Sequence, residues 1–367
     1  MSSRASPKQK RIFVTDCEGP ISINDNAFEL SKHFIPEGDH LFTAISRYDD
    51  ILSDLAKRSN YKAGNTLKLI LPFLKAYEVT NKRIGQFSLS NLLLVPGAKY
   101  TIKFVQKNMP SYIVSTSYEQ YLKELCNTIK FPMERVYCTS LNIDKYKISM
   151  TERKRLKMLA DDIKSRPFIE IPRDAKNLVD IEPEGLKTLK MLDKIFGKEI
   201  LSMEVGKMLL DVNPIGGYEK AEAVKEICAR NRSNLSETMY VGDSITDVEA
   251  FRKVREGGGL TVSFNGNKYA IREADLAVAS NNTITIGILA EVFRKYGKKE
   301  VLNLMGKWNY RTILNTCDWK LTKKLESMYL DSVPVVEKIT SENEEKLISK
   351  CSVMRRIVRG EAIGNLG

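Results

Sequence analysis

The sequence predicts an α/β protein with a Rossmann-like, doubly wound parallel sheet, a helical cap insertion and a helical C-terminal extension. Short apolar runs with strand character recur along the 367 residues, and several end abruptly in acids or hydroxyls. Between these runs lie segments of about 10–15 residues with helical periodicity, which is the pattern of strand–helix–strand units. The hydrophobic content of 43% is enough to bury a large core and an attached second domain.

Two of the predicted strands end in pairs of acids. Asp16 and Glu18 follow an apolar run near the N-terminus, and Asp243 and Asp247 follow a later one. In an open parallel sheet, ligands bind beyond the carboxyl ends of the strands, so these acids are expected around one crevice. Four acids there would repel one another unless a cation held them. A set of oxygen ligands without sulfur suits Mg²⁺, which the sequence therefore predicts as the cofactor.

The groups that a phosphate needs come from the intervening sequence. A third apolar run, 110–117, ends in hydroxyls, of which Ser115 is the first and Thr116 the alternative. A hydroxyl and nearby N–H groups at a strand-to-helix turn can hold phosphoryl oxygens. Lys220 stands at the start of a predicted helix after two glycines, with Lys225 as its alternative one turn later. A cation at this place can offset charge on a transferring phosphoryl group.

This ordered set resembles the haloacid dehalogenase-like (HAD) superfamily. Its phosphotransferases carry an Asp-x-Asp strand end, a Ser/Thr strand end, a Lys and a Gly-Asp-(Ser/Asn)-x-x-Asp strand end, and all four elements occur here in that order. The match covers about half of the chain. It implies a Mg²⁺-dependent phosphatase that hydrolyses a small phosphorylated metabolite through an aspartyl-phosphate intermediate. A phosphomutase or phosphotransferase with the same site and a non-catalytic accessory or binding subunit are the alternatives.

The resemblance also assigns roles to the individual residues. It makes Asp16 the nucleophile and Glu18 the general acid and base. Ser115 becomes a phosphate ligand and Lys220 the charge stabiliser. Asp16 and Asp243 become magnesium ligands with the backbone carbonyl of Glu18, and Asp247 becomes a second ligand or the partner of Lys220.

Two residues depart from the superfamily pattern. Glu18 stands where most relatives have Asp, although an enolase-phosphatase branch also uses Asp-x-Glu-Gly, and Pro20 replaces the usual Thr or Val. Proline fixes φ near −65° and donates no hydrogen bond. The same region, with the segment 24–28, is similar to an archaeal HAD family named for its likeness to subunit R of energy-converting hydrogenase.

The elements divide the chain into five kinds of segment. The predicted division is a flexible N-terminal tail at 1–10, a catalytic core at 11–25, 95–140 and 206–281, a helical cap at 26–94, a second charged helical insertion at 141–205 and a helical C-terminal extension at 282–367. In the superfamily, an insertion at the first place closes over the crevice. The second insertion covers the site, binds a partner or decorates the core, and the sequence leaves these alternatives open.

Composition limits the classes of partner. The net charge of +12 favours anions, and the expected partners are a small phosphorylated substrate, a second copy of the chain or an acidic protein. The basic stretches, including 355–359, lack an aromatic platform or nucleic-acid motif, so they are expected to be solvated surface and nucleic acid is not expected. No apolar run is long enough for a membrane span or a signal peptide, which predicts a cytoplasmic protein.

The cysteines and histidines do not form a recognisable site in the sequence. The six cysteines are scattered, so reduced thiols are expected, with Cys17 a spacer rather than a nucleophile. His33 and His40 lie in one short segment with two acids and are expected to be ordinary polar residues rather than metal ligands.

Overall fold

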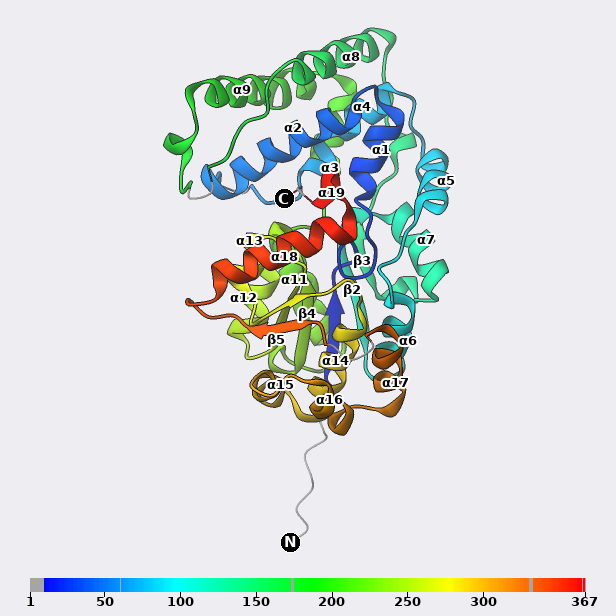
Figure 1. Ribbon diagram of the computed structural model, residues 1–367. Coiled ribbons are helices and arrows are strands. Elements are labelled where there is room, and N and C mark those ends of the chain that lie inside the picture. Colours follow the sequence, from blue (N-terminus) through cyan, green and yellow to red (C-terminus); the bar gives the residue numbers. More distant parts are fainter. Residues whose placement is uncertain (1–9, 60, 173–174, 330–332, 365, 367) are drawn as a thin grey trace.

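The computed structural model describes residues 10–59, 61–172, 175–329, 333–364 and 366 (Figure 1). The predicted flexible tail, apart from Lys10, lies outside the described residues. A seven-stranded sheet with the order β3-β2-β1-β4-β5-β6-β7 forms the centre, and β7 alone of these strands is antiparallel to its neighbour. The strands are β1 Ile12–Thr15, β2 Ser111–Tyr118, β3 Val136–Thr139, β4 Thr238–Gly242, β5 Leu260–Phe264, β6 Leu276–Ala279 and β7 Val335–Lys338.

The central strands are apolar because both of their faces are buried. In β1, Phe13 packs into one apolar cluster, whereas Ile12 and Val14 pack into another on the opposite face. This is the alternation of side chains along a strand, with both faces covered as parallel sheets require. The register pairs Thr15 with Val241 of β4, so β1 and β4 end at the same edge.

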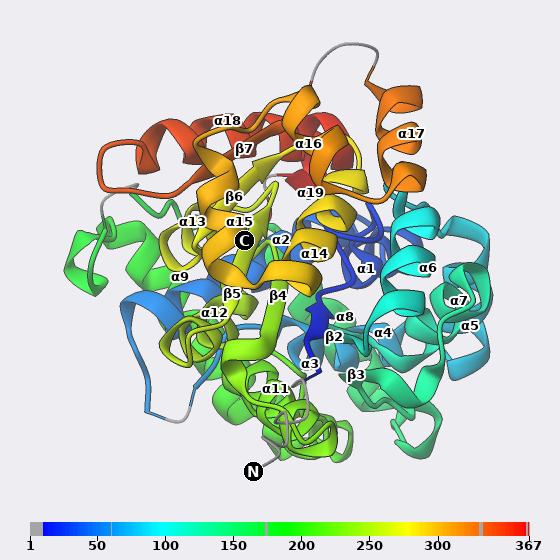
Figure 2. The same ribbon diagram turned by 90° about the horizontal axis from the view of Figure 1, so that it is seen from below.

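Helices cover both faces of the sheet (Figure 2). On one face lie α6 Ala98–Asn108, α7 Glu119–Ile129, α14 Ile284–Tyr296 and α15 Lys298–Met305. On the other face lie α11 Tyr218–Arg230, α12 Val248–Glu256, α13 Lys268–Glu273 and α18 Glu344–Arg359. The predicted doubly wound α/β core is therefore confirmed.

A separate group of helices, here called the helical domain, lies beyond the carboxyl edge of the sheet (Figure 1). It consists of α1 Asn26–Phe34, α2 Gly38–Asp50, α3 Thr66–Leu69, α4 Leu71–Ala76, α5 Asn81–Asn91, α8 Met150–Lys164, α9 Pro183–Lys194 and α10 Lys207–Asp211. Residues of both predicted insertions share one apolar cluster, in which Tyr48 stacks on Phe196 and Phe73 meets the edge of the same ring. The second insertion therefore packs on the first, and the two form one unit.

The start of α8 illustrates how the second insertion folds locally. Ser149 accepts a hydrogen bond from the N–H of Glu152, whose side chain accepts one from the N–H of Ser149. This reciprocal capping box satisfies two N–H groups that the first turn leaves without partners.

The C-terminal segment is helical apart from one strand that the sequence did not predict. Its remaining helices are α16 Tyr310–Thr316, α17 Trp319–Met328 and α19 Glu361–Gly364. The strand β7 pairs with β6 and extends the sheet. Of its four residues, two are half-exposed, one is exposed and one is buried, as at a sheet edge. A strand this short gives too weak a pattern to recognise in the sequence. Among the described residues, no helix has the length and apolar character needed to span a bilayer.

Candidate active site

The acids predicted at the strand ends lie together at the carboxyl edge of the sheet. Asp16 follows β1 directly, and Asp243 follows β4. One carboxylate oxygen from each of Asp16, Asp243 and Asp247 lies within 4.8 Å of the others, and all three side chains are buried. The carboxylate of Glu18, the fourth predicted acid, is not part of this group.

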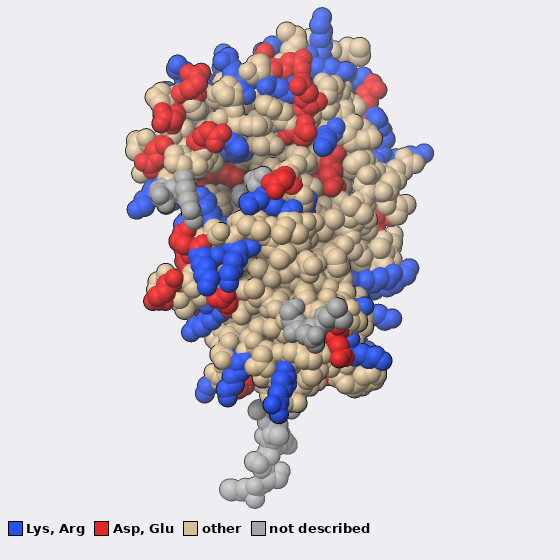
Figure 3. Space-filling model, in the orientation of Figure 1, with Lys and Arg blue, Asp and Glu red and all other residues tan. Residues whose placement is uncertain are grey.

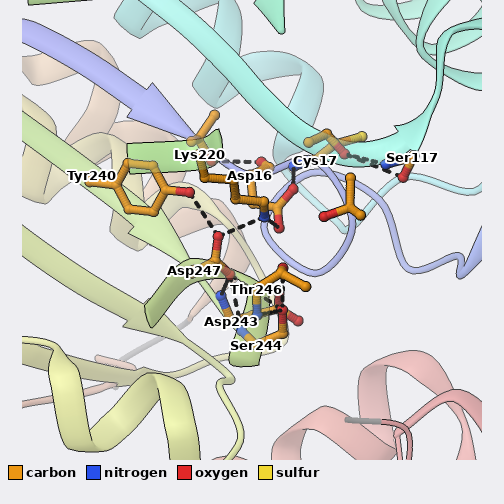
Figure 4. A network of polar contacts seen from close by, with 12 residues as sticks. Asp16, Cys17, Ser117, Lys220, Tyr240, Asp243, Ser244, Thr246 and Asp247 are labelled. Carbon is orange, nitrogen blue, oxygen red and sulfur yellow. Dashed lines mark hydrogen bonds and ion pairs between the residues drawn. The ribbon is translucent and has the colours of Figure 1, made fainter. Parts of the chain in front are cut away.

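Lys220 provides a positive charge inside the acidic group (Figure 4). Its ammonium lies 2.5 Å from Oδ2 of Asp16 and 2.8 Å from Oδ1 of Asp247, and its side chain is 0% exposed. A lysine is rarely buried unless it is paired in this way. Burial lowers the pKa of Lys220, but the charges of Asp16 and Asp247 together outweigh it and raise the pKa above its ordinary value, so Lys220 stays charged. Lys225, the alternative in the sequence, is instead exposed and pairs with Glu222.

Burial dominates the electrostatics of Asp16. Loss of solvent raises the pKa of this carboxyl, Lys220 lowers it, and the neighbouring Asp247 and Asp243 raise it again, to about 7. Below about pH 7, the metal-free site therefore favours a proton on Asp16. A bound cation would favour the ionised form.

Asp247 is held on both of its oxygens. Oδ1 accepts the bond from Lys220 and a bond of 2.7 Å from the hydroxyl of Tyr240, while Oδ2 accepts the N–H groups of Asp243 and Ser244 at 2.9 and 3.1 Å. Tyr240 is fully buried in β4 and was not singled out in the sequence, where it reads as one more apolar strand residue. These bonds fix the loop that presents Asp243.

The turn after β1 packs closely against this loop. Gly19 has φ +97°, and a Cβ there would lie 2.3 Å from Oδ2 of Asp243, so only glycine fits. The turn is closed by hydrogen bonds from the N–H groups of Ile21 and Ser22 to the carbonyl of Cys17. Pro20 lies between these residues and its missing N–H removes neither bond, so this departure from the superfamily pattern leaves the turn intact.

Glu18 points toward the helical domain. Its Oε1 accepts a hydrogen bond of 2.8 Å from the N–H of Asn26, the first residue of α1. Burial and the nearby Asp25 raise the pKa of Glu18 well above its ordinary value. Burial therefore favours the protonated form of this carboxyl, which can give a proton away.

The hydroxyls predicted at the end of β2 line the same cavity. Ser115, Thr116 and Ser117 all line it, and the N–H of Ser117 donates to Oγ of Ser115 over 3.3 Å. Oγ1 of Thr116 is buried and has no hydrogen-bond partner among the described residues. The structure therefore places both predicted candidates, Ser115 and Thr116, at the cavity.

The cavity lies between the core and the helical domain. It has a volume of about 110 Å³, which is small. Its core side is formed by Asp16, Glu18, Asp243 and the hydroxyls of β2, and its far side by Phe42, Asp49, Thr66 and other residues of the helical domain. A group that enters this cavity meets side chains from both parts.

The donor set fits a hard divalent cation. The acidic group offers oxygen atoms alone, which suits Mg²⁺. In the described part of the chain, no hydrogen bond engages Oδ1 of Asp243, whereas both oxygens of Asp247 are already bonded. The described residues hold no second such group of metal-ligating side chains, and His33 and His40 pack against aromatic rings.

Cys17 does not offer a nucleophile in this site. Its thiol is buried, with Oγ of Ser22 at 3.9 Å, and burial raises its pKa well above the ordinary value. A thiol held in the protonated form is a poor nucleophile. The described cysteines are all free, as expected.

The expectation for the basic stretch 355–359 was wrong in part. Arg355 and Arg359 are buried at the cavity, and both form ion pairs with Oδ2 of Asp243. Their spacing of four residues places them on one face of a helix, but nothing in the sequence shows which element that face contacts. Elsewhere basic and acidic side chains are interspersed over the visible face (Figure 3).

Comparisons with known proteins agree with this architecture. The model of the haloacid dehalogenase-like hydrolase family matches residues 64–289, more than half of the chain. The structure of the gene product AF1437 from Archaeoglobus fulgidus is 27% identical, with a TM-score of 0.79, and the match covers 98% of this chain and 99% of that one.

Two further proteins are similar to this chain. The bifunctional enzyme MtnB/MtnX of Bacillus licheniformis is 29% identical over 143 residues, which are 37% of this chain and 30% of the relative, so the chain spans less than a third of that protein. A phospho-aspartyl intermediate analogue of phosphoserine phosphatase is 13% identical, with a TM-score of 0.45, over 76% of this chain and 98% of that one. The likeness to the hydrogenase-related archaeal family stays a prediction. On the extent of the family match, the chain belongs to the haloacid dehalogenase-like hydrolases.

Proposed function

We propose that this hydrolase is a Mg²⁺-dependent phosphatase that acts on small phosphate monoesters through a phosphorylated Asp16. The observation that carries the proposal is the buried group of Asp16, Lys220 and Asp247 beside Asp243, facing a small cavity lined with hydroxyls. An acid that must attack phosphorus has to be held in place and kept ionised. Lys220 supports both requirements through its bond to Asp16.

Asp16 and Asp243 are the residues that would hold Mg²⁺, and Asp247 would act as the partner of Lys220. Each oxygen of Asp247 already accepts at least two donors, whereas each oxygen of Asp16 accepts one, from Cys17 or Lys220. Oδ1 of Asp243 accepts no hydrogen bond from the described residues. When bound, the cation would offset the negative charge of the phosphoryl oxygens and favour the ionised form of Asp16. We expect Ser115 or Thr116 to donate to a phosphoryl oxygen.

The two acids of the first motif would divide the work. One carboxylate oxygen of Asp16 forms a bond to phosphorus while the bond from phosphorus to the leaving oxygen breaks. Glu18 gives its proton to that oxygen, which leaves as an alcohol. Ionised Glu18 then takes a proton from the water that attacks the phosphorus, and this step releases inorganic phosphate and restores Asp16. The raised pKa of Glu18 supports the first of these proton transfers.

The small cavity supports a small substrate. Because residues of the helical domain close its far side, a phosphate on a large protein or nucleic acid would not reach Asp16 without a change of structure. The identity of the substrate would be set by the side chains of α2 and the segment 64–67, which line the far wall.

Two substitutions test the proposal. Asp16→Asn should abolish Mg²⁺-dependent hydrolysis of both p-nitrophenyl phosphate and alkyl phosphates, because it removes the nucleophile. Glu18→Gln should slow alkyl phosphates by about 10²–10⁴-fold but p-nitrophenyl phosphate much less, because nitrophenolate leaves without a proton. Turnover should be measured by phosphate release, with Lys225→Met as a control on an exposed residue of α11.

The outcomes separate the alternatives. Near-wild-type activity of Asp16→Asn would show that the assignment of this active site is wrong. Equal slowing of both substrates by Glu18→Gln would refute the general-acid role of Glu18, while the assignment of Asp16 as the nucleophile would stand. Transfer of the phosphoryl group to a second alcohol instead of water would indicate a phosphotransferase. Absence of turnover with Mg²⁺ or Mn²⁺ across a broad panel would favour the binding subunit.

A further inference from the structure

The C-terminal helix α18 reaches the candidate active site along one of its faces. Leu347 and Cys351 of this helix pack against Ala277 and Ala279 of β6. Arg355 and Arg359 continue the same face at intervals of four residues. Figure 1 shows α18 between the core and the helical domain. Packing on the face of the core sheet at β6 thus carries two guanidinium groups to the cavity.

Arg355 is bound to Asp243 through two acceptors. Its Nη1 donates to Oδ2 of the carboxylate and lies 3.3 Å from the backbone carbonyl oxygen of the same residue. The arginine is 4% exposed, so water competes little for these bonds. Burial lowers the pKa of Arg355 and Asp243 opposes that effect. An arginine buried to this extent needs its carboxylate partner.

Arg359 joins the same carboxylate to the connection between β1 and the helical domain. Its Nη1 lies 3.1 Å from Oδ2 of Asp243. Its Nε donates to the carbonyl of Ile23 over 3.1 Å, and its Nη2 donates to the carbonyl of Asn24 over 2.6 Å. One planar guanidinium therefore fixes the loop after β4 against the segment that leads into α1.

Both arginines bind the same oxygen of Asp243. Since Oδ2 takes both ion pairs, the carboxylate cannot rotate without breaking them, and Oδ1 is left without a described hydrogen bond. Outer groups that hold a ligating carboxylate in this way commonly set its orientation toward a metal. Arginine suits the task because its donors form a rigid fork, whereas the ammonium of lysine is a point charge on a flexible stem.

We propose that Arg355 and Arg359 are positioning residues that hold Asp243 in the orientation that binds the divalent cation, which makes α18 a part of the active site. The proposal rests on the proposed function, because it assumes that Asp243 is a metal ligand. Both arginines lie C-terminal to residues 64–289, the part of the chain that matches the family model.

If the arginines acted only through their charge, their removal would change the metal affinity in the opposite direction. Two positive charges beside a metal site repel the cation, so their removal should tighten metal binding if orientation did not matter. If orientation dominates, removal should weaken binding by about 10–100-fold, the usual effect of losing an outer partner of a metal ligand. The sign of the change in affinity therefore decides between the two roles.

The experiment measures the affinity of the purified full-length chain for Mn²⁺, by electron paramagnetic resonance of the free ion, without any substrate. The variants are Arg355→Met, Arg355→Lys and Arg359→Met, each checked for folding by circular dichroism. Arg356→Met is the matched control, because Arg356 lies on the same helix, is half-exposed and pairs with Glu361. We expect Arg355→Met and Arg359→Met to bind Mn²⁺ about 10–100-fold more weakly than the wild type.

The lysine variant separates geometry from charge. Arg355→Lys keeps the charge and loses the fork, so it should also weaken binding, while Arg356→Met should leave the affinity unchanged. If Arg355→Met does not fold, Arg355→Lys and Arg359→Met decide the question. Unchanged or tighter binding by the methionine variants, or wild-type affinity of Arg355→Lys, overturns the inference.

The wild type separates the inference from the proposed function. Absence of Mn²⁺ binding by the wild type would refute the metal site and the inference with it. Wild-type binding that the arginine variants leave unchanged would refute the inference alone.

Discussion

Substitution of Lys220 by methionine should destabilise the metal-free protein more than any change of an exposed lysine. The ammonium of Lys220 is fully buried between Asp16 and Asp247, at 2.5 and 2.8 Å. Methionine fills a similar volume but leaves two neighbouring buried carboxylates without their cation. Removal of one partner from a buried ion pair typically costs about 3–5 kcal/mol, so we expect a loss of about 4 kcal/mol in the free energy of unfolding.

A bound cation should recover part of this loss. Metal held at 100 times its dissociation constant adds about 2.7 kcal/mol to the stability of a protein. The variant site lacks the positive charge of Lys220, so Mg²⁺ meets less repulsion there and should bind more tightly. Each tenfold gain in affinity narrows the stability gap by about 1.4 kcal/mol.

The assay is urea unfolding, followed by circular dichroism in EDTA and again in Mg²⁺. Lys225→Met is the matched control, because Lys225 lies on the same helix and pairs with an exposed Glu222. It should show no measurable change in either condition. The reasoning is refuted if Lys220→Met is as stable in EDTA as Lys225→Met, or if Mg²⁺ widens the gap between the variant and the wild type.

Two further predictions concern the same network. Tyr240→Phe removes the 2.7 Å hydrogen bond to Asp247 and little volume, so the free energy of unfolding of the metal-free protein should fall by about 1.5–3 kcal/mol. Tyr137→Phe, which loses a hydrogen bond to a surface glutamate, is the control. An equally small effect of both substitutions would contradict a stabilising role of the buried hydroxyl. Burial raises the pKa values of Asp16 and Glu29 from 3.8 and 4.5 to about 7, so the folded state binds more protons than the unfolded state between those values. In EDTA, the free energy of unfolding should therefore be greatest near pH 4 and fall as the pH rises to 7, by up to about 1.4 kcal/mol per pH unit for each group. Urea unfolding curves that show this free energy rising over that range would overturn the raised pKa values.

The sequence by itself determined the core and the neighbourhood of its acids. Apolar runs that end in Asp16 and Asp243 are a local pattern, and the parallel arrangement of such strands places their carboxyl ends at one edge. The helical start before Lys220 is also local. The order of these motifs therefore predicted the fold class and the group of residues that meet, before any contact was known.

Tertiary structure decided how the two helical insertions are related. Each has helical periodicity of its own, but the contact of Tyr48 and Phe73 with Phe196 joins segments far apart in the chain. Periodicity shows that a helix has an apolar face and does not show what that face packs against. Only the folded chain shows that the second insertion covers the first.

Tertiary structure also decided the partners of the acids. Glu18 lies two residues from Asp16 in the sequence, yet its carboxyl bonds to the start of α1 instead of joining the acidic group. Arg355 lies 112 residues from Asp243 and looks in sequence like any basic surface residue. Its burial at the site follows from the packing of α18 on β6. A long-range contact of this kind leaves no local pattern, because it depends both on the apolar face of the helix and on the face of the sheet that receives it.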